Sequence, residues 1–241
     1  MGIPEYLCLI LVCGTGAFVQ RVTGFGMGII AMLFLPGLFH SHTVPAAIMS
    51  ILSGTTNLFH SIEGRKHIRW RAMIPPFCAA LITIPLSISL AVYLPQAAMK
   101  RLLGVVLALL SLYFLFASKK IHLKPTIANG LLTGSISGVL TGLFTSGGPP
   151  MVLYFVHAIP EKLAYFATIQ TFFCLNNIYA TGNRILNGLI TREVLVYTAL
   201  AGIGVFLGDK VGGKVFHKLD ADRLRKVIYL AMLFSGILML F

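Results

Sequence analysis

The chain has 241 residues, of which 57% are hydrophobic and 11% are charged, and its formal net charge is +12 at pH 7. Soluble domains carry about 25% charged residues, so this composition excludes an ordinary soluble protein. The basic residues lie in short segments between apolar runs, which is typical of membrane orientation and not of nucleic-acid binding. The sequence therefore predicts an all-α membrane protein that is embedded in the lipid bilayer and binds no nucleic acid.

The first half of the chain starts with an apolar region at 6–39 that a glycine-rich cluster at 23–28, Thr-Gly-Phe-Gly-Met-Gly, interrupts. The cluster leaves two pieces of roughly 14 residues each, and helices of this length reach about 21 Å, less than the roughly 30 Å of a bilayer core. We therefore expect a re-entrant broken-helix hairpin, with two short full crossings as the alternative. Three transmembrane helices are predicted to follow, at 44–62, 72–93 and 101–117.

The second half repeats this order, with an apolar hairpin region at 126–158 and predicted transmembrane helices at 163–182, 194–213 and 224–241. Its break at 145–150 reads Thr-Ser-Gly-Gly-Pro-Pro and lies about 122 residues after the first break. Asn57 and Asn177 are likewise 120 residues apart. Such self-similarity predicts a duplication into repeats 1–121 and 122–241, and paired interruptions in two halves indicate the binding site of a transporter.

The distribution of Lys and Arg tests the topology. If each broken segment returns to its own side, each half has three crossings and the second repeat is inverted. The loops at 63–71, 118–126, 159–163 and 210–226 then collect 14 basic residues on one side, against 4 in the loops at 94–101 and 183–193. If each broken segment crosses once, the split is 9 and 9. Since a strong bias marks the cytoplasmic side, we expect two inverted repeats with both termini outside the cytoplasm.

Two segments carry a resemblance to a known family. Residues 14–26 read Gly-Thr-Gly-Ala-Phe-Val-Gln-Arg-Val-Thr-Gly-Phe-Gly, and residues 138–150 read Gly-Val-Leu-Thr-Gly-Leu-Phe-Thr-Ser-Gly-Gly-Pro-Pro. They resemble the two signatures of the sulfite exporter TauE/SafE family, also called TSUP, and the similarity extends over the whole chain. The resemblance implies a small duplicated transporter of sulfur-containing anions such as sulfite and organosulfonates, in the plasma membrane (the inner membrane of a bacterium).

The breaks themselves favour anion binding. A helix N-terminus exposes unpaired N–H groups and about half a positive charge, which together make an anion site. Thr145 or Ser146 can cap a helix that begins near Pro149 and Pro150, where a missing N–H costs nothing. The expected substrate-binding residues are Gln20, Arg21, Thr23, Gly24, Phe25, Gly26, Asn57, Thr145, Ser146, Gly147, Gly148, Pro149 and Asn177.

Several of these residues have a structural alternative. Arg21, the one basic residue inside an apolar region, either pairs with the anion or extends to the membrane surface. Asn57 and Asn177 either bind the ligand or join helices by hydrogen bonds. Scattered glycines such as Gly202, Gly204 and Gly208 are expected to serve close helix packing.

No Asp or Glu is predicted at mid-membrane, so no carboxylate proton relay is visible; Asp209 lies near the end of a predicted crossing. No nucleophile–base pair and no metal-ligand spacing occurs, so we expect no enzyme, no metal and no cofactor. The predicted function is a secondary transporter that moves a small anion by alternating access. An anion channel with the same site is the main alternative, and a homo-oligomer or a subunit of a larger complex stays open.

Overall fold

The computed structural model describes residues 2–117, 123–215 and 221–240, and every regular element in these ranges is helical. The basic residues Lys119, Lys120 and Lys218, the expected repeat boundary at 121–122 and the last residue of the predicted helix 224–241 lie outside the described residues. In the described part, five helices are long and apolar enough to cross a membrane: Ile3–Thr23, Trp70–Tyr93, Gln96–Phe116, Ile127–Phe144 and Arg192–Val215. The chain is therefore an all-helical, multi-pass membrane protein.

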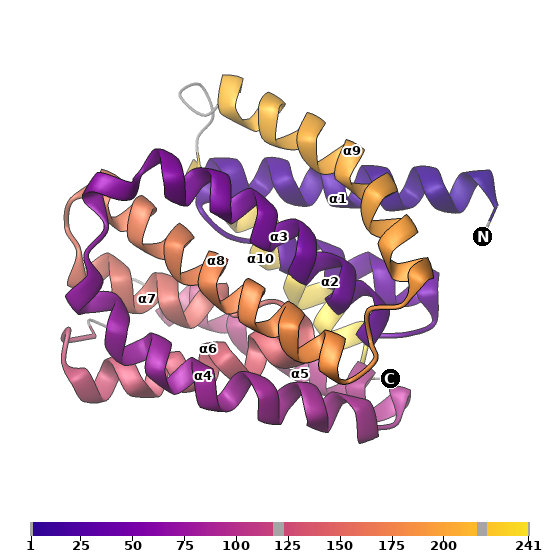
Figure 1. Ribbon diagram of the computed structural model, residues 1–241, viewed down its shortest axis with the longest axis horizontal. Coiled ribbons are helices and arrows are strands. Elements are labelled where there is room, and N and C mark those ends of the chain that lie inside the picture. Colours follow the sequence, from indigo (N-terminus) through magenta and orange to yellow (C-terminus); the bar gives the residue numbers. More distant parts are fainter. Residues whose placement is uncertain (1, 118–122, 216–220, 241) are drawn as a thin grey trace.

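The helices lie roughly side by side along the long axis of the molecule, and both ends of the chain lie at the same end of the bundle (Figure 1). The first half contains α1 (Ile3–Thr23), α2 (Met27–Phe39), α3 (Thr43–Glu63), a short 3-10 turn (Arg65–His67), α4 (Trp70–Tyr93), α5 (Gln96–Leu112) and a π turn (Tyr113–Ala117). The second half contains α6 (Ile127–Phe144), α7 (Gly148–Ala158), α8 (Lys162–Leu186), α9 (Arg192–Val215) and α10 (Ala221–Leu238).

Both apolar regions break where the sequence predicts, but the expectation that the first break leaves two pieces of similar length is wrong. In the first region α1 has 21 residues and α2 has 13, and in the second α6 has 18 and α7 has 11. The first helix of each pair is longer because it continues through its own glycines, such as Gly14 and Gly16, which pack against neighbouring helices. At 1.5 Å per residue α1 is about 31 Å long, whereas α2 and α7 reach only about 20 Å and 17 Å.

Left-handed backbone conformations end the two long helices. Gly24 has φ 87° and Gly26 has φ 112°, values that glycine adopts without strain. Thr145 has φ 52°, which costs a residue with a Cβ about 1–2 kcal/mol. The hydroxyl of Thr145 offsets this cost, because it donates to the Ala46 carbonyl at 2.9 Å and accepts from Arg184 at 3.2 Å.

The long first helices pack on helices of the opposite half, α1 along α9 and α6 along α4. Glycines make this packing close: a Cβ at Gly134 of α6 would overlap the Pro76 carbonyl, and one at Gly208 of α9 would overlap the Gly14 carbonyl. The packing interpretation is thus confirmed for Gly208. Gly202 differs, because an added Cβ would meet only Leu52, at an ordinary contact distance of 3.7 Å.

Candidate functional site

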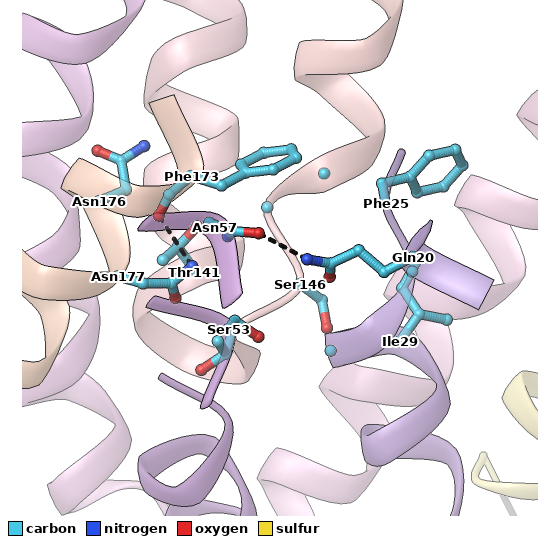
Figure 2. A pocket seen from close by; sticks show the side chains of 15 residues that line it. Gln20, Phe25, Ile29, Ser53, Asn57, Thr141, Ser146, Phe173, Asn176 and Asn177 are labelled. Atoms are coloured by element: carbon cyan, nitrogen blue, oxygen red, sulfur yellow. Dashed lines mark hydrogen bonds between the residues drawn. The ribbon is translucent and has the colours of Figure 1, made fainter. Parts of the chain in front are cut away.

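A buried cavity lies where the two breaks meet, between α1, α2, α3, α6, α7 and α8 (Figure 2). Its volume is about 30 Å³, and a water molecule needs about 10–15 Å³, so the cavity holds a few waters or the head of a small ion. The lining residues are Gln20, Phe25, Gly26, Gly28, Ile29, Ser53, Asn57, Thr141, Thr145, Ser146, Gly147, Gly148, Phe173, Asn176 and Asn177.

Most of the residues predicted for the site lie at this cavity: Gln20, Phe25, Gly26, Asn57, Thr145, Ser146, Gly147, Gly148 and Asn177. Arg21, Thr23 and Gly24 line a second cavity instead, and Pro149 is buried and lines neither. The prediction omitted Gly28, Ile29, Ser53, Thr141, Phe173 and Asn176. Helical spacing could have found several of them, because Ser53, Thr141 and Phe173 lie four residues before Asn57, Thr145 and Asn177.

Two short helices begin at the cavity. The N-cap of α2 is Gly26, and the N-cap of α7 is Gly147. A Cβ at Gly28 would overlap the Thr145 carbonyl, and one at Gly148 would lie 3.2 Å from the Phe25 Cβ, so each break rests directly on the other. The first turn of α2 keeps all its N–H groups, whereas α7 has prolines at its second and third positions. The α2 end therefore offers more backbone donors to a ligand.

Side-chain amides form the polar wall of the cavity. Gln20 donates through Nε2 to Asn57 Oδ1 at 2.6 Å, and Asn177 donates through Nδ2 to the Phe173 carbonyl at 2.9 Å. Asn176 is 1% exposed, yet neither its Nδ2 nor its Oδ1 has a protein partner. An unmade hydrogen bond of a buried polar group costs about 1–3 kcal/mol. The amide of Asn176 is therefore available to water or to a ligand in the cavity.

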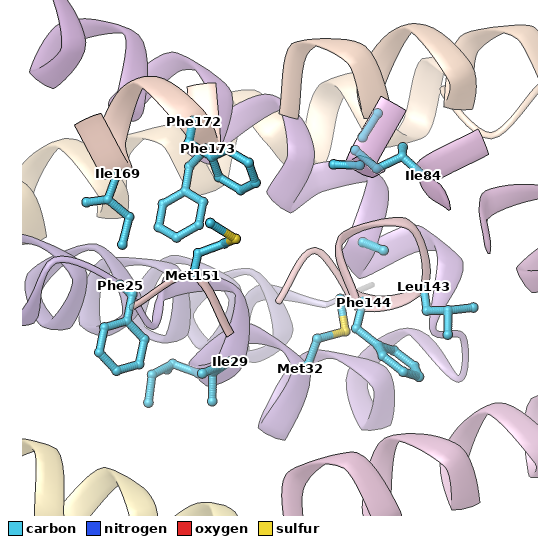
Figure 3. Close-up of a cluster of buried hydrophobic side chains, with 14 of the residues drawn as sticks. Phe25, Ile29, Met32, Ile84, Leu143, Phe144, Met151, Ile169, Phe172 and Phe173 are labelled. Carbon is cyan, nitrogen blue, oxygen red and sulfur yellow. The ribbon is translucent and has the colours of Figure 1, made fainter. Parts of the chain in front are cut away.

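Apolar side chains close the cavity on its other sides. Phe25, Ile29 and Phe173 line the cavity and also belong to the main hydrophobic core, which continues into Met151 and Phe172 (Figure 3). A wall of this kind offers no hydrogen bonds, and in a medium of low dielectric constant each polar contact to an ion is stronger than in water. A ligand bound here is therefore held mainly by the few amides, hydroxyls and backbone N–H groups.

No charged side chain is among the residues that line this cavity, but Arg184 lies directly behind it. The count of Lys and Arg in the predicted loops places Arg184 in the loop at 183–193, and this is wrong. Helix α8 continues to Leu186, and Arg184 is 1% exposed. Its Nη2 donates to the carbonyls of Thr141 and Gly142 at 3.1 Å and 2.9 Å. The guanidinium thus caps the C-terminus of α6 and places a buried positive charge next to the site.

The second cavity is larger, about 450 Å³, and it opens beside the end of α1. Arg21, Glu63 and Lys162 are among its lining residues. Arg21 forms an ion pair with Glu63, with 3.9 Å between Nη1 and Oε2. The structure therefore does not bring Arg21 into the cavity between the breaks. It places Arg21 in a neighbouring, larger space that reaches the break at Thr23 and Gly24.

Comparison with known proteins adds to this geometry. The family described as sulfite exporter TauE/SafE matches residues 8–239 of the chain. The chain is also similar to a probable sulfite/organosulfonate exporter TauE of Cupriavidus necator, with 25% identity over 221 residues, which cover 90% of this chain and 86% of the relative. No solved structure matches the chain.

Proposed function

Because the chain belongs to the sulfite exporter TauE/SafE family, and is therefore a membrane transporter, we propose that it exports a sulfur oxyanion or an organosulfonate. The observation that carries this proposal is the buried cavity at the paired helix N-termini, whose polar wall holds an amide without a protein partner. The name of the Cupriavidus relative, a probable sulfite/organosulfonate exporter, supports the same class of substrate.

The chemistry of the cavity fits an anion with several oxygen atoms. Sulfite and sulfonate groups present three oxygens that only accept hydrogen bonds, so they need a surface of donors. The N–H groups at the start of α2 and the amide of Asn176 supply such donors around one space. No carboxylate lines the cavity, which disfavours a cation. The buried charge of Arg184 lowers the cost of holding an anion there.

An inverted repeat accounts for the arrangement of the helices. If α1 to α5 correspond in order to α6 to α10, the pair α1–α9 corresponds to α6–α4, and α3–α8 and α5–α10 each correspond to themselves. All these pairs pack together in the described part of the chain. Inverted repeats with broken helices at their interface are the usual framework for alternating access. The small cavity then represents the binding site, and the second cavity represents its approach from one side.

We place that approach on the cytoplasmic side, because Arg21 and Lys162 line it and most basic loops lie at the same end. Arg21 then acts by attracting anions into the approach, and the amides of the inner cavity bind them. Both termini lie outside the cytoplasm in this orientation. The expected membrane is the plasma membrane, which in a bacterium is the inner membrane.

Transport by purified protein in liposomes tests the proposal. Vesicles preloaded with unlabelled sulfite or methanesulfonate should accumulate the labelled anion by counterflow, with saturation at high concentration. A channel with the same site would give unitary currents and no counterflow. The proposal would be overturned if protein that is folded by size-exclusion chromatography moved neither sulfite nor any organosulfonate faster than empty vesicles.

A further inference from the structure

A buried histidine and an aspartate face each other between α3 and α9. His60 Nε2 lies 3.2 Å from Asp209 Oδ1, and the side chains are 4% and 28% exposed. The other ring nitrogen, Nδ1, is buried and has no hydrogen-bond partner. His60 also lines the second cavity, next to the end of α1. The pair therefore lies one turn along α3 from Asn57, which lines the cavity between the breaks.

The other charged groups around the pair come from four helices, α1, α3, α8 and α9. Arg21 of α1 pairs with Glu63 of α3, and a Cβ at Gly213, one turn beyond Asp209, would lie 3.4 Å from the Arg21 Nε. From α8, Lys162 and Tyr165 line the same cavity. On α9, Lys210 extends over the Phe206 ring at 4.3 Å. The remaining helices packed on α3 are α2 and α6, and their sequences contain no ionisable residue.

Arg21 and Glu63 pair with each other, so His60 is the cation that faces the Asp209 carboxylate. While His60 is neutral, the negative charge of Asp209 lacks this partner. Opposite charges within about 4 Å favour each other's ionised forms, and an unpaired charge on a partly buried side chain is costly. An imidazolium paired with the Asp209 carboxylate removes that charge. The pair is thus a binding site for one proton.

This site borders the path of the anion. An unbalanced negative charge beside the cavity repels an anion, and a proton on the pair removes the repulsion. Coupling between two ligands is reciprocal, so an anion in the cavity must also favour protonation of the pair. His60 lines the second cavity, which gives a proton a route to the pair.

We propose that His60 and Asp209 form a proton site coupled to anion binding, so that the transporter takes up a proton when it binds its anion. The proposal rests on the proposed function and adds the coupling ion to it. The sequence alone shows no proton relay, because Asp209 lies near the end of a predicted crossing. Only the folded structure brings Asp209 next to His60.

Calorimetric binding of methanesulfonate tests the proposal, because this anion does not titrate near neutral pH. The wild-type protein in detergent is titrated from pH 6 to 9 in buffers of different ionisation enthalpy. At each pH, the slope of the binding enthalpy against the buffer ionisation enthalpy gives the number of protons taken up per anion. We expect uptake that rises to about one proton within this range. His60→Gln and Asp209→Asn should each reduce it to near zero while the anion still binds. His157→Gln, on α7, is the matched control and should keep the wild-type uptake.

Methanesulfonate binding with no proton uptake at any pH would overturn the coupling and leave the proposed function intact. Undiminished uptake in both folded variants would assign the proton to another group and would equally overturn it. Absence of binding by both methanesulfonate and sulfite would instead overturn the proposed function, and the coupling with it. Two variants are used so that a folding defect in one does not decide the outcome.

Discussion

Replacing Asn176 by leucine should stabilise the ligand-free protein and weaken anion binding. Leucine has the same number and branching of side-chain heavy atoms as asparagine, with bulkier methyl groups and no polar atoms. Both polar atoms of Asn176 are buried without a protein partner, so their only remaining partners are water and the ligand. The two effects of Asn176→Leu therefore have opposite signs, which few structural defects reproduce.

The magnitudes follow from the hydrogen bonds involved. Each unmade hydrogen bond costs about 1–3 kcal/mol, so removing both polar atoms would greatly stabilise a protein whose cavity was dry. Waters in a cavity of about 30 Å³ make some of these hydrogen bonds and reduce the effect. We therefore expect a net stabilisation of about 1 kcal/mol, or about 2–4 °C in the unfolding temperature. A hydrogen bond to a charged group is worth about 1.5–3 kcal/mol, so the dissociation constant should rise about 10- to 100-fold.

Thermal unfolding in detergent, with and without methanesulfonate, measures both quantities, and calorimetry gives the dissociation constant directly. Without anion the variant should unfold at a higher temperature than wild type, and with saturating anion the order should reverse. Ser111→Ala is the control, because Ser111 is buried but its hydroxyl donates within α5, to the Leu107 carbonyl. A folded Asn176→Leu protein with an unchanged dissociation constant would refute the assignment of Asn176 as a ligand.

Four further predictions concern other parts of the molecule. Gly148→Leu should abolish liposome transport with little loss of folded protein, because the new side chain enters the cavity against Phe25. The control Gly202→Leu should keep its transport activity, and equal losses of activity in both variants would remove the special role of the break. Gly134→Val should sharply reduce the folded yield in size-exclusion chromatography, because its Cβ overlaps a backbone carbonyl of α4; wild-type yield would contradict the packing. Arg184→Met should cost about 2–4 kcal/mol in thermal unfolding, since two buried carbonyls lose a charged donor, and an unchanged midpoint would exclude its capping role. Single cysteines at 64–71 should resist labelling by a membrane-impermeant thiol reagent in intact cells, and rapid labelling would reverse the orientation.

The sequence predicts the positions of both breaks because glycine and proline act on the local backbone. Gly24 and Gly26 need only their own φ angles to end α1, and the prolines at the start of α7 need only their missing N–H groups. The lengths of the helices on either side depend on tertiary packing. Gly14 stays helical because α9 lies against it, and no local pattern in α1 shows that neighbour.

Site residues that follow helical periodicity can be predicted in the same way, and those that depend on distant helices cannot. Gln20 and Asn57 meet in the cavity as side chains from two helices, and their polarity inside apolar runs already marks them. Arg21 lies next to Gln20 in sequence, but the 100° turn of the helix points it into the other cavity. Arg184 is misplaced by the sequence because a basic residue near a helix end normally marks a loop, and only its buried carbonyl partners reveal its place.

The pairing of α1 with α9 sets a problem for synthesis at the ribosome. Roughly 170 residues separate the end of α1 from the start of α9, and translation at about 5–20 residues per second takes on the order of ten to thirty seconds to make them. During that interval α1 has left the ribosome, but α9, against which its glycines pack, has not yet been made. The pair α4–α6, its counterpart in the proposed repeat, is separated by only a short stretch and waits a few seconds. The two helix pairs thus form on different schedules, and α1 spends the longer time in the membrane without its partner helix.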